Sequence, residues 1–561
     1  MKKILVILGF VIICPAALAG FLPSIPESTM QAAQEAEILA AFEKPKSEIV
    51  RVGISDNAFK VYDYNETNIF GNAPVDIYDG ETWLTTVSAD EVVNVKLQSG
   101  MFVISKGEII DQVQGPVRFV CKNGFLGVKG LRRAGSQALY RGDIELAKCT
   151  KKYGRFHSVN VIEIEEYLKG VVPNEMPVRF GLEALKAQSV AARNYALSPR
   201  AKIYDTFDVV DSVASQVYFG AGTEKDLGTK AVEETEGIVA LYNWDLILAQ
   251  YSSTAGGYTE SFSNTFSDPM TKMFPPVSKP YLIAKPDMLG QKPLNIEEDA
   301  AAFYKSTPDS YDMKSPYYRW ERFWTKTELQ KAVQNNLAAQ SATGFVQPEF
   351  KRGEILPDIV RLEVKQRGDS GKIIELDIVT KTKTYKVYKE LVIRRLLTCQ
   401  GKALPSANLV FEQEFDEYGN LKSVKAFGGG FGHGVGLSQY GAGFMATELK
   451  KGFEEILKHY YTDIILATKP VILSPENSTI RQNFYTKNKH AEIVVDNKYK
   501  LSYFLVNING KEHKFNFNNK FFDRVERFDI SNHIKHGKNT VTFIYPVDED
   551  RNKGIRLFVE L

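Results

Sequence analysis

The chain has 561 residues, of which 44% are hydrophobic and 25% are charged, and this composition is typical of a globular protein with three or four domains. The 70 Lys and Arg residues exceed the 68 Asp and Glu residues by two, and the lysines at positions 2 and 3 account for that excess. Such a chain lacks an overall basic field to attract a polyanion, so we predict no nucleic-acid partner.

Residues 1–19 have the pattern of a secretory signal peptide. Lys2 and Lys3 precede an apolar run over residues 4–13, and Ala17-Leu18-Ala19 fits a cleavage site. Because the apolar run is too short to span a bilayer well, the pattern favours export over an uncleaved anchor. We expect the protein in the cell wall, in the periplasm or on the outer face of the membrane, with residues 20–48 as a linker that includes a short helix over residues 30–42.

Three cysteines remain after cleavage at residue 19: Cys121, Cys149 and Cys399. Cys121 and Cys149 fall in one predicted domain and could pair in an oxidising compartment, which would leave Cys399 as a free thiol. Cys14 raises the alternative of a lipoprotein signal, but the bulky Ile13 before it argues against this reading. The chain has no CxxC pair and therefore no thiol-based zinc motif, and we predict neither a metal nor a cofactor.

Residues 49–160 alternate short apolar runs with glycine and asparagine turns, which predicts a β-rich N-terminal part. Strands are expected over residues 49–54, 102–104, 117–120, 144–146 and 158–162.

Residues 161–466 are expected to form the central part of the protein, beginning with two helices. Gly170 is predicted to end the first helix, because glycine is favoured at a helix C-cap. Pro173 and Pro177 cannot both lie inside a helix, so they predict a rigid turn around Glu175. Apolar and small residues at three- and four-residue steps then predict a second helix from about Gly181, able to lie close to a neighbour.

Glu175 is the candidate catalytic residue of this turn. Its neighbours Val171, Val172, Met176 and Phe180 are apolar, so the carboxyl group should be poorly solvated and its pKa should rise. A carboxyl group that holds a proton at neutral pH can act as the general acid in glycoside cleavage. The alternative is a glutamate at a helix N-terminus that only stabilises the helix dipole.

Further along, a short helix is expected over residues 229–237, with strands over 238–241 and 246–250. Residues 251–259 read as a polar, glycine-containing loop of the kind that often carries binding groups. A helix within residues 320–337 should be capped by Thr325 or Thr327. Period-two alternation over residues 360–378 predicts a β-meander with one polar face.

Eight glycines lie within residues 427–443, which read FGGGFGHGVGLSQYGAG. Neither phosphate-loop spacing occurs, and a second histidine at metal-binding distance is missing, so the loop is interpreted as presenting His433, Ser438 and Gln439. A serine hydrolase using Ser438 is a further alternative, although Tyr440 replaces the last glycine of a nucleophile elbow. A helix over residues 442–461 should follow.

Residues 471–561 are asparagine- and lysine-rich and alternate at period two. A hairpin is indicated by two alternating runs on either side of Asn509-Gly510. The predicted fold class is therefore α+β: a β-rich catalytic region with a central helical segment, plus a C-terminal all-β sandwich-like module.

Several blocks, in order, resemble the stage II sporulation protein D / LytB family. They cover about residues 49–466 and read YLKGVVPNEMP, EALKAQSVAARNYA, SQVYFG, YSSTAGGYTESF, SPYYRWERFW and GFGHGVGLSQYGAGFMA. The C-terminal module lies outside the resemblance and is weakly similar to accessory modules of glycoside hydrolases.

The resemblance implies two activities: a peptidoglycan lytic transglycosylase that cleaves glycan strands lacking stem peptides, and, as the rival, a non-catalytic enhancer of a cell-wall amidase. The family's catalytic glutamate maps onto Glu175. Some members carry zinc-binding cysteines before the QVY block, but residues 208–215 contain none here, which puts zinc in doubt. Seven residues are predicted to bind sugar hydroxyl and acetamido groups: Gln188, Gln216, Tyr218, Ser253, His433, Ser438 and Gln439.

Overall fold

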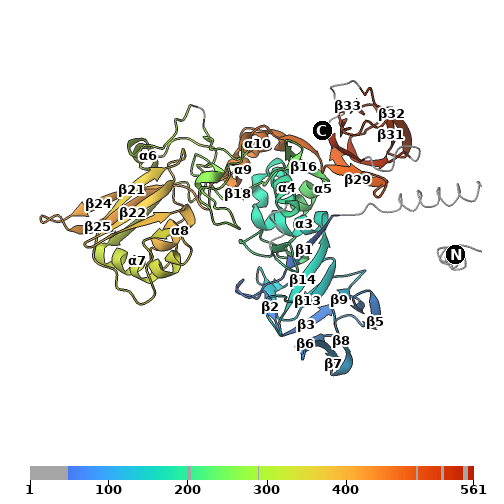
Figure 1. Ribbon diagram of the computed structural model, residues 1–561, viewed down its shortest axis with the longest axis horizontal. Helices are drawn as coiled ribbons and strands as arrows, with labels where there is room; N and C mark the ends of the chain where they lie inside the picture. Colours follow the sequence, from blue (N-terminus) through green and yellow to red (C-terminus); the bar gives the residue numbers. More distant parts are fainter. Residues whose placement is uncertain (1–47, 199–203, 289, 488–489, 520–523, 547–553) are drawn as a thin grey trace, which may run out of the picture.

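The computed structural model describes residues 48–198, 204–288, 290–487, 490–519, 524–546 and 554–561. The predicted signal peptide and the linker, apart from its last residue, lie outside the described residues. Within those ranges, no helix is both long and apolar enough to cross a membrane. The architecture is α+β and rich in strands, as predicted, with helices at its centre and a group of strands at the C-terminal end (Figure 1).

Two sheets form the N-terminal part, which lies below the central helices in Figure 1. Their strands are β1 (Ile49–Gly53), β2 (Asp63–Tyr64), β3 (Glu66–Gly71), β4 (Val75–Asp79), β5 (Thr82–Val87), β6 (Val93–Gln98), β7 (Met101–Lys106), β8 (Glu108–Val113), β9 (Val117–Val120), β10 (Leu126–Val128), β13 (Asp143–Lys148), β14 (Phe156–Glu163) and β15 (Val209–Val210). The first sheet has the order β15-β1-β14-β13-β9-β4-β5, with β2 beside β14, and the second has the order β10-β3-β6-β7-β8. A small hairpin pairs β11 (Arg132–Arg133) with β12 (Ser136–Gln137).

The five predicted strands of this part correspond to β1, β7, β9, β13 and β14. The apolar runs between glycine and asparagine turns identified these strands in the sequence, and in several of them the side chains alternate between the core and the outside. In β1, for example, Val50 and Val52 are fully buried while Arg51 between them is partly exposed.

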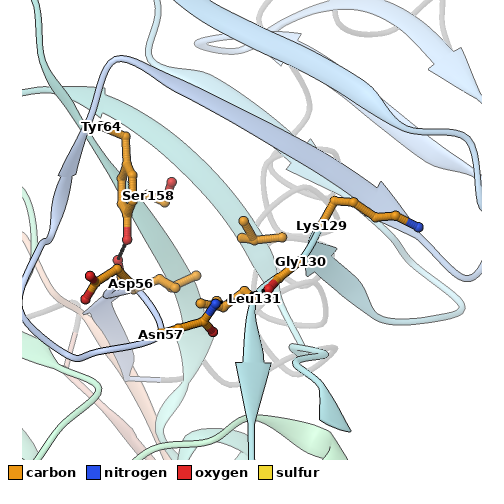
Figure 2. Close-up of a pocket in the computed structure, with 9 residues that line it drawn as sticks. Asp56, Asn57, Tyr64, Lys129, Gly130, Leu131 and Ser158 are labelled. Carbon is orange, nitrogen blue, oxygen red and sulfur yellow. Dashed lines mark hydrogen bonds between the residues drawn. The ribbon is translucent and has the colours of Figure 1, made fainter. Parts of the chain in front are cut away.

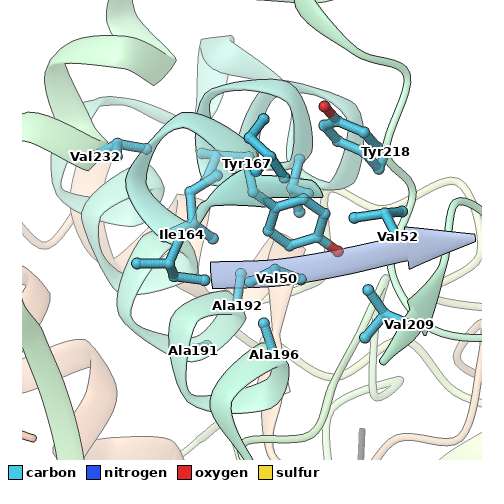
Figure 3. Packing of buried hydrophobic residues seen from close by; sticks show 14 of the residues in the cluster. Val50, Val52, Ile164, Tyr167, Ala191, Ala192, Ala196, Val209, Tyr218 and Val232 are labelled. Carbon is cyan, nitrogen blue, oxygen red and sulfur yellow. The ribbon is translucent and has the colours of Figure 1, made fainter. Parts of the chain in front are cut away.

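The central helices pack on the first sheet through small and apolar side chains. They are α3 (Ile164–Glu175), α4 (Leu182–Leu197) and α5 (Asp226–Glu233), with a 3₁₀ turn over Val178–Phe180 between the first two. Tyr167 of α3 and Ala192 of α4 are buried against Val50 and Val52 of β1 (Figure 3). The alanines of α4 let it approach its neighbours closely, as the sequence predicted.

The remaining elements of the core are β16 (Ile238–Tyr242), β17 (Asp245–Leu246), β18 (Tyr251–Ser252), β26 (Leu437–Ser438), α9 (Gln439–Thr447), α10 (Phe453–Tyr460) and β27 (Ile465–Thr468). Three predictions about the central part need correction. The predicted single helix over residues 442–461 is wrong, because Lys450 has a φ of 55° and Gly452 begins a new helix as its N-cap. The predicted strand over residues 246–250 is also wrong, since it contains only the end of β17. Helix α5 begins three residues earlier than predicted and ends four residues earlier.

A separate hydrophobic core organises a middle domain, drawn in yellow and orange at the left of Figure 1. Its elements are α6 (Glu297–Tyr304), β19 (Trp320–Thr325), α7 (Lys326–Ser341), β20 (Val346–Gln347), β21 (Ile359–Arg367), β22 (Ile373–Thr380), β23 (Thr384–Tyr388), α8 (Glu390–Leu396), β24 (Leu409–Phe415) and β25 (Leu421–Gly428). The sheets have the orders β19-β25-β24 and β20-β23-β22-β21. Thr325 caps α7 through a capping box with Glu328, and β21 and β22 are the predicted meander.

The C-terminal module is a sandwich whose second sheet is shared with the core. Its strands are β28 (Val471–Leu473), β29 (Thr479–Thr486), β30 (Glu492–Asp496), β31 (Tyr503–Ile508), β32 (Lys511–Asn516), β33 (Val525–Asp529), β34 (Gly537–Ile544) and β35 (Ile555–Glu560). One sheet has the order β29-β34-β31-β32, and β31 and β32 form the predicted hairpin. The other runs β17-β16-β27-β35-β30-β33, so the last strand of the chain extends a sheet that begins in the core (Figure 1).

The possible disulfide between Cys121 and Cys149 does not form. Both thiols, and that of Cys399, are free in the structure. The Cys149 Sγ lies 3.1 Å from the His157 Nε2, whereas the Cys121 Sγ faces the Ala73 carbonyl oxygen at 3.7 Å, so the two sulfur atoms have different partners.

Candidate active site

Glu175 is the last residue of α3, and this corrects the prediction that the helix ends at Gly170. Gly170 is buried inside the helix, and a Cβ atom there would lie 2.7 Å from the ring of Tyr218. The glycine therefore serves close packing rather than a helix end. Pro173 lies inside α3, in its last turn, and its ring faces Gly228 of α5.

The position of Glu175 excludes one of the two interpretations of this residue. The carboxyl group lies at the C-terminal end of α3, so the alternative of a helix N-terminal glutamate stabilised by the dipole is wrong. Here the negative end of the helix dipole disfavours the charged form of the side chain. The turn after it, over residues 176–181, leads directly into α4, which begins at Leu182 as predicted.

Three segments from different parts of the chain meet the Glu175 carboxyl group. The backbone N–H of Val217 donates to its Oε1 at 2.6 Å, and the side chains of Gln439 and Tyr251 hydrogen-bond to it. Burial raises its pKa from an ordinary 4.5 to about 7, because loss of solvation outweighs the hydrogen bonds that act in the opposite direction. The side chain can therefore carry a proton near neutral pH while remaining partly exposed.

The three predicted glutamines surround this carboxyl group. The Gln439 Nε2 donates to the Gln188 Oε1 at 3.2 Å, and the Gln216 Nε2 donates to the Tyr251 Oη at 2.9 Å. Gln216 is held in turn by the Tyr167 hydroxyl at 3.1 Å. Gln188 is fully buried, and its Nε2 has no hydrogen-bond partner among the described residues, so it supports Gln439 from behind rather than facing a ligand directly.

Tyr251 is a residue of the site that the sequence reasoning missed. It lies in the short strand β18, next to the parallel strand β26, and is partly exposed. Burial above all, and then the nearby Glu175 carboxyl group, raise the pKa of the Tyr251 hydroxyl well above the ordinary value, so this hydroxyl stays a neutral hydrogen-bond donor. An aromatic residue at the start of the polar 251–259 loop was the available signal.

Two predicted sugar-binding residues have structural contacts instead. Tyr218 is almost fully buried, stacks near Tyr167 and donates its hydroxyl to Asn160 at 2.8 Å. Ser438 is fully buried and caps α9, with its Oγ accepting from the Gly441 N–H at 3.3 Å. These contacts account for both side chains, and they leave Ser438 without the exposed hydroxyl that the serine hydrolase alternative requires.

No contact joins His433 or Ser253 to the Glu175 carboxyl group among the described residues; Ser253 follows β18, and His433 lies in the neighbouring glycine loop, where the Gly434 N–H donates to the Ser252 Oγ at 3.2 Å. The His433 Nδ1 accepts from the Val435 N–H at 3.0 Å, its carbonyl accepts from Lys372 at 2.9 Å, and burial lowers the ring's pKa to about 4. The imidazole is thus neutral and shapes the glycine loop. Ser253 is partly exposed, two residues after Tyr251.

Residues 208–215, the block in which some family members hold zinc, contribute Asp211 to a buried ion pair here. The Asp211 carboxylate accepts from Arg133 at 2.6 Å and from the Ser55 hydroxyl at 2.6 Å, and both charged side chains are almost fully buried. Its donor set does not fit a zinc ion, because the one carboxylate is already paired with a guanidinium. Among the described residues, no group of three or more His, Cys, Asp or Glu side chains is arranged to hold a metal.

A family model described as stage II sporulation protein, SpoIID, matches residues 152–242. A second model, a domain of unknown function, matches residues 268–436. The range similar to SpoIID includes Glu175, Gln188 and Gln216, whereas Tyr251 and Gln439 lie outside both matched ranges.

Curated relatives agree with this assignment. The chain is 31% identical to an amidase enhancer of Bacillus subtilis strain 168 over 308 residues, which is 54% of this chain and 40% of the relative. It is 28% identical to stage II sporulation protein D of the same strain over 320 residues, which is 54% of this chain and 74% of the relative. A stage II sporulation protein D of Bacillus amyloliquefaciens is 29% identical over 334 residues, 57% of this chain and 78% of the relative. The match thus spans less than half the length of the amidase enhancer.

Two cavities lie away from Glu175. One of about 1190 Å³ separates the loop around Met270 from the C-terminal module at Arg556, and none of the predicted site residues lines it. The other, of about 210 Å³, is bordered by Asp56, Tyr64 and Ser158 in the N-terminal part (Figure 2). Burial acts to raise the pKa of Asp56, but backbone N–H donors outweigh it and the pKa is lowered, so this carboxyl group does not fit a general acid.

Proposed function

We propose that this protein is a lytic transglycosylase that cleaves the bond between N-acetylmuramate and N-acetylglucosamine in peptidoglycan strands lacking stem peptides. The observation that carries the proposal is the pKa of Glu175, which burial raises to about 7. No charged neighbour contributes to that pKa, so Glu175 acts as a single carboxyl group rather than as half of a carboxylate pair.

A single carboxyl group suffices for this reaction. Protonated Glu175 gives its proton to the glycosidic oxygen, and the bond from that oxygen to the anomeric carbon of the muramate breaks. The 6-hydroxyl oxygen of the same muramate forms a new bond to the anomeric carbon, and its proton passes to the Glu175 carboxylate. The residue acts first as acid and then as base, and each turnover restores the protonated form.

The surrounding groups hold the carboxyl group for these steps. The Val217 N–H donates to Oε1, and the side chains of Tyr251 and Gln439 also hydrogen-bond to the carboxyl group. These three donors also stabilise the carboxylate that exists after the proton has left. Gln188 accepts from Gln439 and so positions it against Glu175.

The test is the chemistry of the product. Peptide-free strands digested by the wild-type protein should carry 1,6-anhydromuramate ends in mass spectrometry. Glu175→Gln should give none, and Glu166→Gln, a change of a partly exposed glutamate on the same helix, should behave as the wild type. Reducing muramate ends would show a hydrolase instead, and intact strands would contradict catalysis.

The rival function is a non-catalytic enhancer of a cell-wall amidase, and the relative named amidase enhancer favours it. Under that function the protein would bind peptidoglycan and an amidase as partners. Stimulation of an amidase that survives Glu175→Gln, in the absence of strand cleavage, would support the rival. Both functions require a protein outside the cytoplasm, in the cell wall, in the periplasm or on the outer face of the membrane. The signal-like pattern of residues 1–19 supports this location.

A further inference from the structure

Two aromatic side chains form an exposed pair beside the candidate site. The rings of Tyr317 and Phe431 lie 4.5 Å apart at an angle of 38°. Phe431 remains 41% exposed and Tyr317 is partly exposed. Both residues belong to the 268–436 region, whose family model has no assigned function.

The backbone holds Phe431 outward rather than letting it fold into the core. It is flanked by Gly430 and Gly432, with φ angles of 90° and 102°, a conformation that favours glycine. The Phe431 N–H donates to the Thr254 carbonyl at 2.9 Å, and the Gly430 N–H donates to the Tyr317 carbonyl at 2.8 Å. The presented ring is therefore fixed in place before any ligand arrives.

The pair is continuous with the surface around Glu175. Thr254, which bridges to Phe431, follows Tyr251 by three residues with a bend at Ser253, so the Cα atoms of Tyr251 and Thr254 are at most about 10 Å apart. Between them, the Ser253 carbonyl accepts from the N–H of Tyr440 at 3.1 Å. The segments that carry Tyr251 and Phe431 are therefore neighbours, with the partly exposed Ser253 and Tyr440 beside them.

An exposed, rigid aromatic face suits one kind of ligand in particular. The faces of aromatic rings are electron-rich, so they attract the polarised C–H groups on the flat side of a pyranose ring. A polymer bound at Glu175 must continue across the neighbouring surface, and the aromatic pair lies on that surface.

We propose that Tyr317 and Phe431 form a stacking platform for a pyranose ring of the glycan strand, one or two sugars from the bond at Glu175. The 268–436 region would then supply a distal sugar subsite that gives the enzyme a preference for longer strands. The identity of the ligand rests on the proposed function of Glu175, but the platform is tested by binding alone.

The experiment measures binding of peptide-free glycan strands to the full chain carrying Glu175→Gln, which prevents cleavage. In this background, Phe431→Ala and Tyr317→Ala should weaken binding of strands of six or more sugars by about tenfold and leave disaccharide binding unchanged. Phe431→Trp should retain binding, because it keeps an aromatic face. Phe415→Ala is the matched control, since Phe415 is 43% exposed in the same region. Melting temperatures of all variants establish that they are folded.

Each result bears on the platform separately from catalysis. Length-dependent loss of binding supports the platform even when the wild-type protein cleaves nothing, in which case only the proposed transglycosylase function fails. Unchanged binding of long strands by folded Phe431→Ala overturns the platform even when cleavage is normal. Three other outcomes would overturn the platform as well. They are an equal loss of binding for short and long strands, no binding by the parent protein, and loss of amidase stimulation with glycan binding intact.

Discussion

Glu175→Gln is the substitution that tests the site most directly. Glutamine keeps the shape of the side chain and an oxygen that can accept from the Val217 N–H. It cannot deliver a proton, and loss of a general acid typically lowers the rate by about 10²–10⁴-fold. With the wild-type protein, cleavage should fall as the pH rises through about 7, because only protonated Glu175 is active.

The same residue predicts a pH-dependent difference in stability. A pKa raised from 4.5 to about 7 corresponds to about 3 kcal/mol of folding free energy that is lost when the carboxyl group ionises. Since the pKa of the folded state is the higher one, this contribution is fully present below pH 4.5, declines as the pH rises toward 7 and is gone above it. The glutamine variant lacks this loss and should be more stable than the wild type at pH 8.

Two assays together test the role and the pKa of Glu175. Turnover on peptide-free strands and the free energy of unfolding in urea should be measured at pH 4.5 and pH 8 for the wild type, Glu175→Gln and the control Glu166→Gln. A folded Glu175→Gln that cleaves at nearly the wild-type rate would show that the acid lies elsewhere. A stability difference that does not change with pH would show that the carboxyl group is well solvated, and the physical argument for its role would be wrong.

Three further predictions concern the frame that holds the site. Asp211→Asn should lower the free energy of unfolding in urea by about 3–5 kcal/mol, because it leaves the buried Arg133 without its charged partner, and a surface substitution of similar size should not. Gly170→Ala should lower it by about 1–3 kcal/mol, since the added methyl group would meet Tyr218 at 2.7 Å; an unchanged melting temperature would contradict the packing seen in α3. Deletion of residues 471–561 should reduce the melting temperature and solubility of the core, because β27 would lose β35 as its neighbour; a soluble truncated protein with unchanged melting behaviour would show that the shared sheet is dispensable.

The shared sheet also bears on how the C-terminal module should be understood. The sequence changes character near residue 470, and by itself it predicts an appended module. In the structure, Val239, Leu241 and Ala467 of the core pack with Val494 and Phe558 of the module in one apolar cluster. Deletion would expose this cluster to water, so the module is fixed to the core although its boundary in the sequence is clear.

Local patterns determined most of the secondary structure. Short apolar runs identified β14, alternation identified the meander of β21 and β22, the Asn509-Gly510 turn identified a hairpin, and the threonines at 325 and 327 marked the start of α7. The sequence also singled out Glu175, because a carboxyl group among apolar neighbours was visible within a dozen residues. Each of these features depends on interactions between residues close in the chain, which is why they could be predicted.

The tertiary structure decided what a local pattern cannot contain. Gly170 looked like a helix end, but the ring of Tyr218, 48 residues later, requires a glycine there and α3 continues to Glu175. The pKa of Glu175 depends on burial by segments that bring Val217, Tyr251 and Gln439 to it from 42 to 264 residues away. Desolvation and hydrogen bonding are properties of the assembled surroundings, so the sequence singled out the carboxyl group of Glu175, and only the fold determined its pKa and its hydrogen-bond partners.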